Sequence, residues 1–400
     1  MKSIRIPAFF FLLVCMGGLY PFVHNYVLFG GAANILSTGA TVVGFGALFL
    51  WQRSDFKITR SFLRLAAIHI VFLSLWSAIF NTLDYLVTIQ SLLLGLMMIF
   101  LIKSLLGLDN FIRLFVKFFV IMVISMAIGL ALLVLGKLTL LSSIDYASDL
   151  KIWNYGFFFV KRGSESLIAI RPAGWLDEPG SLAFIIMFLV LIIDKFYTDD
   201  KTMNIFKWIL IVGGFLTTSL AHIATAFLYV VSKYARRPKQ IIFTFAAMTI
   251  LLGGAYFAMA ESNDPLVKYL YNRTFQRVTD FVQTGEDAGR GEGFAMGPEI
   301  FNKNPFGISP QQIKMTYPRY QHENIWSPLL YYGVLGFPIF FSLVAVPILL
   351  YRKKNNLNWS LIIILGANLL QRPSYIYPMY LVLIYVLLYT QRISSEKEQV

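Results

Sequence analysis

The chain has few charged residues and almost no cysteine. Only 14% of its 400 residues are Asp, Glu, Lys or Arg, whereas 57% are hydrophobic and the mean hydropathy is +0.66. An ordinary soluble domain carries roughly a quarter charged residues. The single cysteine, Cys15, excludes a disulfide framework and a CxxC metal site. The composition therefore predicts an integral membrane protein, and it excludes a soluble enzyme, a disordered chain and a fibrous one.

The sequence also lacks the common nucleotide and metal motifs. It contains no G-x-x-x-x-G-K-[ST], and Gly136-Lys137 is followed by leucine. After His322-Glu323 the position of a second zinc-binding histidine is occupied by Trp326, so H-E-x-x-H is absent. We therefore expect no ATP hydrolysis, no bound metal and no cofactor.

Apolar runs long enough to cross a bilayer recur along the whole chain. A transmembrane helix needs about 20 mostly apolar residues. The first run follows Lys2 and Arg5 but continues too far for a signal peptide, so we expect an uncleaved span. The predicted spans are residues 6–28, 33–51, 62–80, 85–102, 114–141, 180–194, 240–259, 325–350, 359–370 and 374–391.

The stretch 205–234 is either one very long helix or two short ones that meet at Thr217-Thr218-Ser219. Basic residues flank both of its ends, and basic loops prefer the cytoplasm. Two short spans leave both ends on the cytoplasmic side. We therefore predict a helix pair, about twelve transmembrane helices in total, and cytoplasmic termini.

The basic residues are distributed as this topology requires. Of the 34 Lys and Arg residues, 21 fall in the predicted cytoplasmic segments and 12 in the external ones. The net charge of +13 is therefore an orientation signal, and no nucleic-acid partner is expected. The cytoplasmic loops are short and leave no room for a nucleotide-binding domain.

We expect residues 1–400 to form a single transmembrane domain. Two predicted external segments, residues 142–179 and 260–323, are too long to be turns. Long loops on a rigid scaffold commonly carry function. We therefore expect the functional residues in these two loops and at the points where they enter the membrane.

The first external loop ends in Arg171-Pro-Ala-Gly-Trp-Leu-Asp-Glu-Pro-Gly-Ser181, a rigid and charged approach to a span. The start of the next helix would present free N–H groups that attract anions. Arg171, Asp177 and Glu178 are candidate functional residues. The alternative is that Arg171 meets lipid headgroups and that the two carboxylates only cap the helix.

The second external loop contains Gly289-Arg290-Gly291, the turn Asn304-Pro305-Phe306-Gly307, and His322-Glu323-Asn324 at the entrance of a span. A histidine there is a candidate general base, and an interfacial hydrogen-bonding role is its alternative. Further candidates are Ser219 and His222 near the tip of the helix pair, and Arg372 in the last external turn.

The order of these motifs resembles that of the O-antigen polymerase (Wzy) and O-antigen ligase superfamily. The resemblance covers about half the chain, from Arg171 to Phe337. It implies an all-α polytopic fold of the C-type glycosyltransferase kind in the bacterial inner membrane, with the active site facing the periplasm. The motifs that carry it are Arg171 with Gly-x-x-x-Glu178-Pro179, the short-helix pair, Gly289-Arg290, Pro305-x-Gly307, His322-x-Asn324 and Gly333-x-x-Gly336.

By this resemblance the donor and the acceptor are glycans linked to undecaprenyl pyrophosphate, held among membrane lipids, and a chain-length regulator is a candidate partner. Arg171 and Arg290 match the arginines that hold the pyrophosphate, and His322 matches the histidine that activates the acceptor. Many relatives carry Ser-Arg at the tip of the helix pair, where this chain has Ser219-Leu220, so Arg372 is a candidate substitute. Glu178 completes the candidate catalytic set, and the candidate substrate-binding residues are Asp177, Ser219, His222, Glu323, Asn324 and Arg372.

The chemistry of such a donor explains the missing motifs. A sugar on a lipid pyrophosphate is already activated, and arginines can stabilise the negative charge that develops as the sugar leaves. A base near neutral pKa must take the acceptor proton, which favours His322. The alternative gives that role to Asp177 or Glu178. Direct displacement without a metal inverts the anomeric centre.

The expected function is therefore a polymerase that joins lipid-linked repeat units into O-antigen or a capsule-type polysaccharide. One alternative is a ligase that transfers the glycan to a lipid A core, and the Glu178-Pro179 block favours the polymerase. The other alternative is a transporter or flippase, since interrupted short helices also occur in transporters. Ionisable residues are scarce in the predicted spans, which favours an enzyme.

Overall fold

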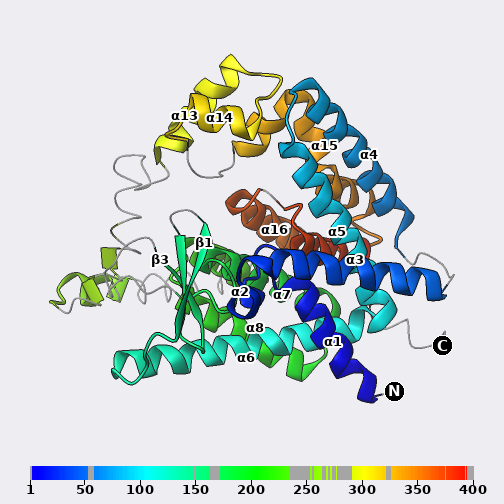
Figure 1. Cartoon of the computed structure of the whole chain (residues 1–400). Helices are drawn as coiled ribbons and strands as arrows, with labels where there is room; N and C mark the ends of the chain where they lie inside the picture. Colours follow the sequence, from blue (N-terminus) through cyan, green and yellow to red (C-terminus); the bar gives the residue numbers. More distant parts are fainter. Residues whose placement is uncertain are drawn as a thin grey trace.

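The computed structural model describes residues 2–52, 58–147, 150–162, 172–234, 253–254, 256–263, 267–268, 271–272, 276, 291–320, 326–373, 375–391 and 393. This part of the chain is mostly helical (Figure 1). Six of its helices are long and apolar enough to cross a membrane: Gly30–Trp51, Arg60–Ile79, Asp84–Leu105, Leu108–Leu133, Pro179–Phe196 and Ser327–Tyr351. The predicted helical membrane architecture agrees with this finding, whereas the count of twelve spans stays a prediction.

The helices follow one another along the chain, with long intervals between α6 and α7 and between α9 and α13. Shorter apolar helices stand beside the six candidate spans. In chain order the helices are α1 (Lys2–Met16), α2 (His24–Phe29), α3 (Ala33–Gln52), α4 (Arg60–Ile79), α5 (Asp84–Leu105), α6 (Leu108–Val134), α7 (Pro179–Phe196), α8 (Lys201–Gly214), α9 (Leu220–Tyr234), α13 (Gly291–Lys303), α14 (Pro310–Thr316), α15 (Ser327–Tyr351), α16 (Trp359–Gln371), α17 (Pro378–Ile384) and the π-helical turn η5 (Tyr385–Tyr389).

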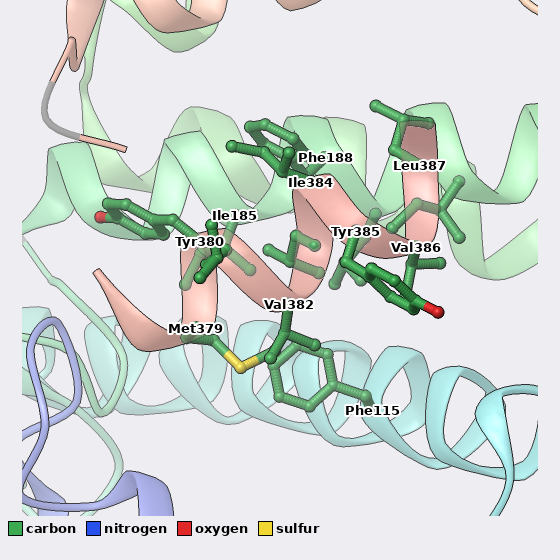
Figure 2. Close-up of a cluster of buried hydrophobic side chains, with 14 of the residues drawn as sticks. Phe115, Ile185, Phe188, Met379, Tyr380, Val382, Ile384, Tyr385, Val386 and Leu387 are labelled. Carbon is green, nitrogen blue, oxygen red and sulfur yellow. The ribbon is translucent and has the colours of Figure 1, made fainter. Parts of the chain in front are cut away.

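Helix α7 lies in the middle of the core. Each side chain from Leu182 to Ile193 is at most 2% exposed. A helix that is apolar on every side is one that the fold surrounds. Figure 2 shows Ile185 and Phe188 of α7 on one side of α17 and Phe115 of α6 on the other. The core therefore fixes α7, and with it the charged segment that precedes this helix.

The predicted first span, residues 6–28, is wrong as a single helix, because α1 and α2 are separated by a turn. A Cβ on Gly18 would lie 2.2 Å from the carbonyl oxygen of Ala33. Only glycine therefore lets the turn pack this closely against the start of α3. Asn25 then donates a hydrogen bond to the carbonyl oxygen of Val14 at 2.8 Å. The apolar run 6–28 therefore contains a turn that tertiary contacts stabilise.

The span predicted at 114–141 is displaced toward the N-terminus in the structure. Helix α6 begins directly after Gly107 and ends just before Gly136, and both glycines have positive φ, 70° and 66°. Positive φ is incompatible with a continuing right-handed helix. The two glycines therefore set the ends of α6, and the apolar residues after it are not helical.

A small antiparallel sheet departs from the all-helical prediction. Its strands β1 (Ser142–Ala147), β2 (Leu150–Asn154) and β3 (Phe159–Arg162) pair in chain order within the first long loop. The sheet lies beside the end of α6 (Figure 1). Isolated bridges join Val160 to Pro172 and Phe22 to Leu176. The sheet and the turn after α1 therefore both hold the approach to α7.

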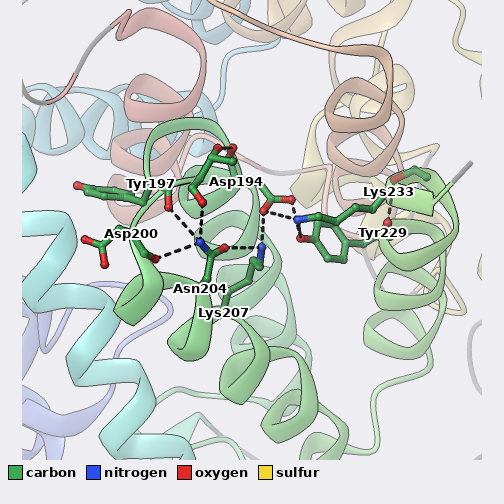
Figure 3. A network of polar contacts seen from close by, with 9 residues as sticks. Asp194, Tyr197, Asp200, Asn204, Lys207, Tyr229 and Lys233 are labelled. Carbon is green, nitrogen blue, oxygen red and sulfur yellow. Dashed lines mark hydrogen bonds and ion pairs between the residues drawn. The ribbon is translucent and has the colours of Figure 1, made fainter. Parts of the chain in front are cut away.

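The predicted helix pair within 205–234 is confirmed. Helices α8 and α9 are separated by a short turn in which Thr218 has a left-handed φ of 49°. Lys207 of α8 and Lys233 of α9 both contact Asp194 near the end of α7, with Nζ–Oδ1 distances of 2.6 and 3.0 Å (Figure 3). The two outer ends of the pair therefore return to the same side of the molecule, as the charge pattern predicted.

The connections between helices gather at two opposite ends of the molecule. At one, the Glu178 end, the backbone N–H of Asp177 donates to the carbonyl oxygen of Pro21 at 2.9 Å. At the other, the Asp194 end, Arg113 forms an ion pair with Asp200 at 2.6 Å. The Glu178 end holds the turn after α1, the approach to α7, the start of α5 and the connection after α16, whereas the Asp194 end holds the start of α6 and the connection between α7 and α8. This alternation agrees with the predicted topology, and its orientation in a membrane stays a prediction.

Candidate functional site

Half of the predicted site residues can be placed. Asp177, Glu178, Ser219, His222 and Arg372 belong to the described residues. The other predicted positions, Arg171, Arg290, His322, Glu323 and Asn324, lie outside the described residues, so their convergence stays a prediction.

Glu178 and Arg372 form an ion pair at the start of α7. Glu178 is the residue before the helix, with an extended backbone, and Pro179 occupies the first helical position, where its missing N–H costs nothing. Arg372 follows the end of α16. The two side chains are only 25% and 15% exposed. The pair therefore joins the approach to α7 to the connection between α16 and α17.

Tyr20 extends this pair into a network. An N–H of Arg372 donates to the Tyr20 hydroxyl, and that hydroxyl lies 3.5 Å from Ser181 Oγ. Burial raises the pKa of Tyr20 well above its ordinary value, which keeps the phenol neutral. The Tyr20 ring also contacts the ring of Tyr377, with 4.3 Å between centroids. Residues from the turn after α1, from α7 and from the connection between α16 and α17 thus meet at one point.

Asp177 and Glu178 have different surroundings although they are neighbours in the chain. The Asp177 side chain belongs to a residue only 3% exposed, and its Oδ1 accepts a hydrogen bond from Ser181 Oγ at 2.7 Å. Glu178 instead faces the guanidinium of Arg372. Arg372, the predicted substitute for a missing substrate-binding arginine, therefore lies against a carboxylate of its own chain.

His222 and Ser219 lie at the tip of the helix pair, as predicted, but the His222 ring points into the protein. It is 0% exposed, and its Nε2 lies 2.9 Å from the carbonyl oxygen of Ile211 in α8. Ser219 is buried as well, and its backbone N–H donates to Thr217 Oγ1 at 3.2 Å. These contacts bind α9 to α8 and close the turn between them.

The Pro-x-Gly turn of the second loop is docked on a break in α15. The backbone N–H of Val334 donates to the carbonyl oxygen of Pro305 at 2.9 Å. Gly333 has φ 64° and ψ −178°, a conformation found almost only in glycine. A Cβ at Gly333 would lie 2.2 Å from the carbonyl carbon of Phe306. Two motifs that are distant in sequence therefore fit each other, and each requires the other.

The second loop forms a small core of its own on this contact. Ser309 caps α14 in a reciprocal pair of hydrogen bonds with Gln312. Tyr320 then lies at the last described position before His322, and its hydroxyl is 3.0 Å from Ser327 Oγ at the start of α15. The residues of this core are Ile300, Ile308, Ile313, Tyr320 and Leu330. The described residues on the two sides of the segment that contains His322 are therefore hydrogen-bonded to each other.

A cavity of about 330 Å³ lies between α5, α14 and α15 at the Glu178 end. Asp84, Thr88 and Ser91 of α5 line it, together with Tyr320 and Tyr377 among others. It therefore extends between the residue that precedes the His322 segment and the ring that contacts the Glu178–Arg372 network. Sequence reasoning missed the cavity. The available signal was the spacing of these three polar residues, which places them on one face of an apolar helix.

Among the described residues, no group of three or more His, Cys, Asp or Glu could hold a metal ion. No protein-family model matches the chain, and no curated protein matches it.

Proposed function

We propose that the protein is a membrane glycosyltransferase, a polymerase that joins undecaprenyl-pyrophosphate-linked repeat units at the periplasmic face of the bacterial inner membrane. One observation carries the proposal. Three features lie at the Glu178 end: the Glu178–Arg372 ion pair, the hydrogen bond from Val334 to Pro305 beside the break at Gly333, and the cavity lined by Tyr320 and Tyr377. Such convergence is expected of an active site and is not required of loops that only connect helices.

In the proposed reaction, an acceptor hydroxyl oxygen forms a bond to the anomeric carbon of the donor. The bond between that carbon and the phosphate oxygen breaks, and undecaprenyl pyrophosphate leaves with the negative charge. Arg171 and Arg290 would stabilise this charge. Each such donor typically contributes about 10²–10³ in rate. Pro172, the first described residue after Arg171, is paired with Val160.

The base in this proposal is His322, which takes the acceptor proton and contributes about 10²–10⁴ in rate. The surroundings of the carboxylates support this choice. Asp177 accepts a hydrogen bond from Ser181, and Glu178 is paired with Arg372. Both carboxylates already contact partners within the chain, which favours His322 as the base. Arg372 then acts as a positioning residue for Glu178.

Deletion of the gene, followed by gel analysis of cell-surface glycan, tests the proposal. A polymerase predicts that the ladder of chain lengths disappears while one repeat unit is retained. Loss of every repeat from the core would indicate a ligase instead. Accumulation of lipid-linked units on the inner leaflet would indicate a flippase, and either result would overturn the proposal.

A further inference from the structure

The cavity between α5, α14 and α15 has a wall of hydroxyl and carboxylate groups on a membrane helix. Asp84, Thr88 and Ser91 follow one another at helical spacing and all face the cavity. Among the described residues, the hydroxyls of Thr88 and Ser91 have no hydrogen-bond partner. Polar side chains in a membrane helix are expensive unless a ligand, water or another helix satisfies them. This wall is therefore suited to a ligand with several hydroxyl groups.

The remaining lining is largely aromatic and is held by contacts of its own. Tyr85 donates to the backbone carbonyl of Tyr331 at 2.8 Å. The Tyr332 ring is stacked on Phe340, with 4.5 Å between centroids. Tyr377 lines the side nearest the Glu178–Arg372 network. Flat aromatic rings opposite hydroxyl groups suit a molecule with both apolar C–H faces and a hydroxyl rim, which describes a sugar ring.

The charges at the cavity argue against a site for an anion. The lining includes one acid, Asp84, and one base, Lys314. The carboxylate of Asp84 already has a partner within the protein, because its Oδ2 accepts a hydrogen bond from the backbone N–H of Gln311 at 2.9 Å. The volume of about 330 Å³ lies at the low end of the roughly 300–1,000 Å³ of small-ligand sites. A neutral sugar therefore fits this cavity better than a pyrophosphate group does.

We propose that this cavity is a carbohydrate-binding subsite, in which Thr88 and Ser91 bind hydroxyl groups of a glycan and the tyrosines stack on its rings. The inference rests on the proposed function for the identity of the glycan. It deepens that function by separating sugar recognition from the arginines that would hold the phosphates.

The test uses full-length protein in lipid nanodiscs and, as probe, the oligosaccharide released by mild acid from the lipid-linked pool of the source cells. Saturation-transfer NMR and titration measure binding. The double variant Thr88→Val, Ser91→Ala should raise Kd about tenfold or more, because it removes two hydrogen-bond partners of the glycan. The matched control is Thr38→Val, Ser74→Ala, two exposed hydroxyls on α3 and α4, which should leave Kd unchanged.

A second pair of variants tests stacking. Tyr331 also lines the cavity. Tyr331→Phe should keep the affinity of the wild type and Tyr331→Leu should lose it, with size-exclusion profiles confirming the fold. The proposed subsite is overturned if the wild type does not bind the oligosaccharide. It is also overturned if the Thr88/Ser91 double variant and Tyr331→Leu bind it with the affinity of the wild type.

Chain extension in the same nanodiscs separates this inference from the proposed function. Sugar binding that depends on the cavity, without any extension by the wild type, would keep the subsite and overturn the polymerase. Chain extension by the cavity variants with an unchanged KM for the acceptor would keep the polymerase and overturn the subsite.

Discussion

The backbone N–H of Val334 donates to the carbonyl oxygen of Pro305, and this 2.9 Å hydrogen bond joins the turn at Pro305 to the break in α15. The break exists because Gly333 adopts a backbone conformation that other residues avoid. The turn at Pro305 and the start of α15 are thereby fixed relative to each other. Tyr320 and Ser327, the residues on the two sides of the segment that contains His322, are hydrogen-bonded to each other beside this contact.

Gly333→Ala should disrupt this contact. The added Cβ would meet the backbone of Phe306 at 2.2 Å, so the turn must detach or α15 must change course. We expect a loss of about 2 kcal/mol or more in the free energy of unfolding. Gly366→Ala in α16 is the control, because a Cβ there has no atom within 4 Å. Thermal unfolding in detergent measures both, and equal melting temperatures would contradict the role of Gly333.

Neutralising either partner of the Glu178–Arg372 pair should destabilise the approach to α7. Each of Glu178→Gln and Arg372→Gln should cost about 1–3 kcal/mol, because both leave a largely buried charge without its partner. The double variant should lose little more than either single variant, since the two side chains act as one unit. Glu299→Gln breaks the exposed pair with Lys303 and should change nothing measurable. Strictly additive losses would show that the pair is not coupled.

Asp194 should matter more to the helix pair than Lys233 does. Asp194→Asn removes the counter-charge of Lys207, whose side chain is 2% exposed, and should cost about 3 kcal/mol. Lys233→Gln affects a side chain that is 37% exposed and should cost less than about 1 kcal/mol. Denaturant or thermal unfolding of the two variants gives the order. A larger effect for Lys233→Gln would be inconsistent with this arrangement.

The stability of the fold should fall in acid because of His24. Burial lowers the pKa of His24 from 6.5 to about 4, and its Nε2 lies 3.1 Å from the carbonyl oxygen of Leu13. The folded chain therefore resists protonation that the unfolded chain accepts. The contribution of neutral His24 to the free energy of unfolding is fully present above pH 6.5. It decreases by up to about 3 kcal/mol as the pH falls toward 4.

His24→Gln provides the comparison for this pH effect. Glutamine can donate to the same carbonyl but does not titrate. Melting temperatures at pH 7.5 and pH 5 should therefore differ less for the variant than for the wild type. The same decrease in both proteins would assign the acid sensitivity to other groups.

The sequence predicted those features of the fold that depend on local hydrophobicity and charge. The helix pair in 205–234 follows from its basic flanks, and the contact of Lys207 and Lys233 with Asp194 bears this out. The turn after α1 was missed because it is closed by Gly18 against Ala33, a contact that no local pattern records.

The candidate site was predictable only in part. The block around Glu178 lies where several loops gather, and its motif was visible in the sequence. The partner of Glu178 was not, because Arg372 reaches it only through the packing of α16 and α17 on the core. The cavity was missed because single polar residues on α5, such as Thr88 and Ser91, look like ordinary interruptions of an apolar run.

Reconstituted chain extension tests the central claim most directly. Purified protein in nanodiscs is supplied with undecaprenyl-pyrophosphate-linked repeat units, and the products are separated by length. The wild type should produce a ladder, whereas Arg171→Ala, Arg290→Ala and His322→Ala, each present at a normal level, should produce none. Ladders of wild-type length and yield from all three variants would contradict the account.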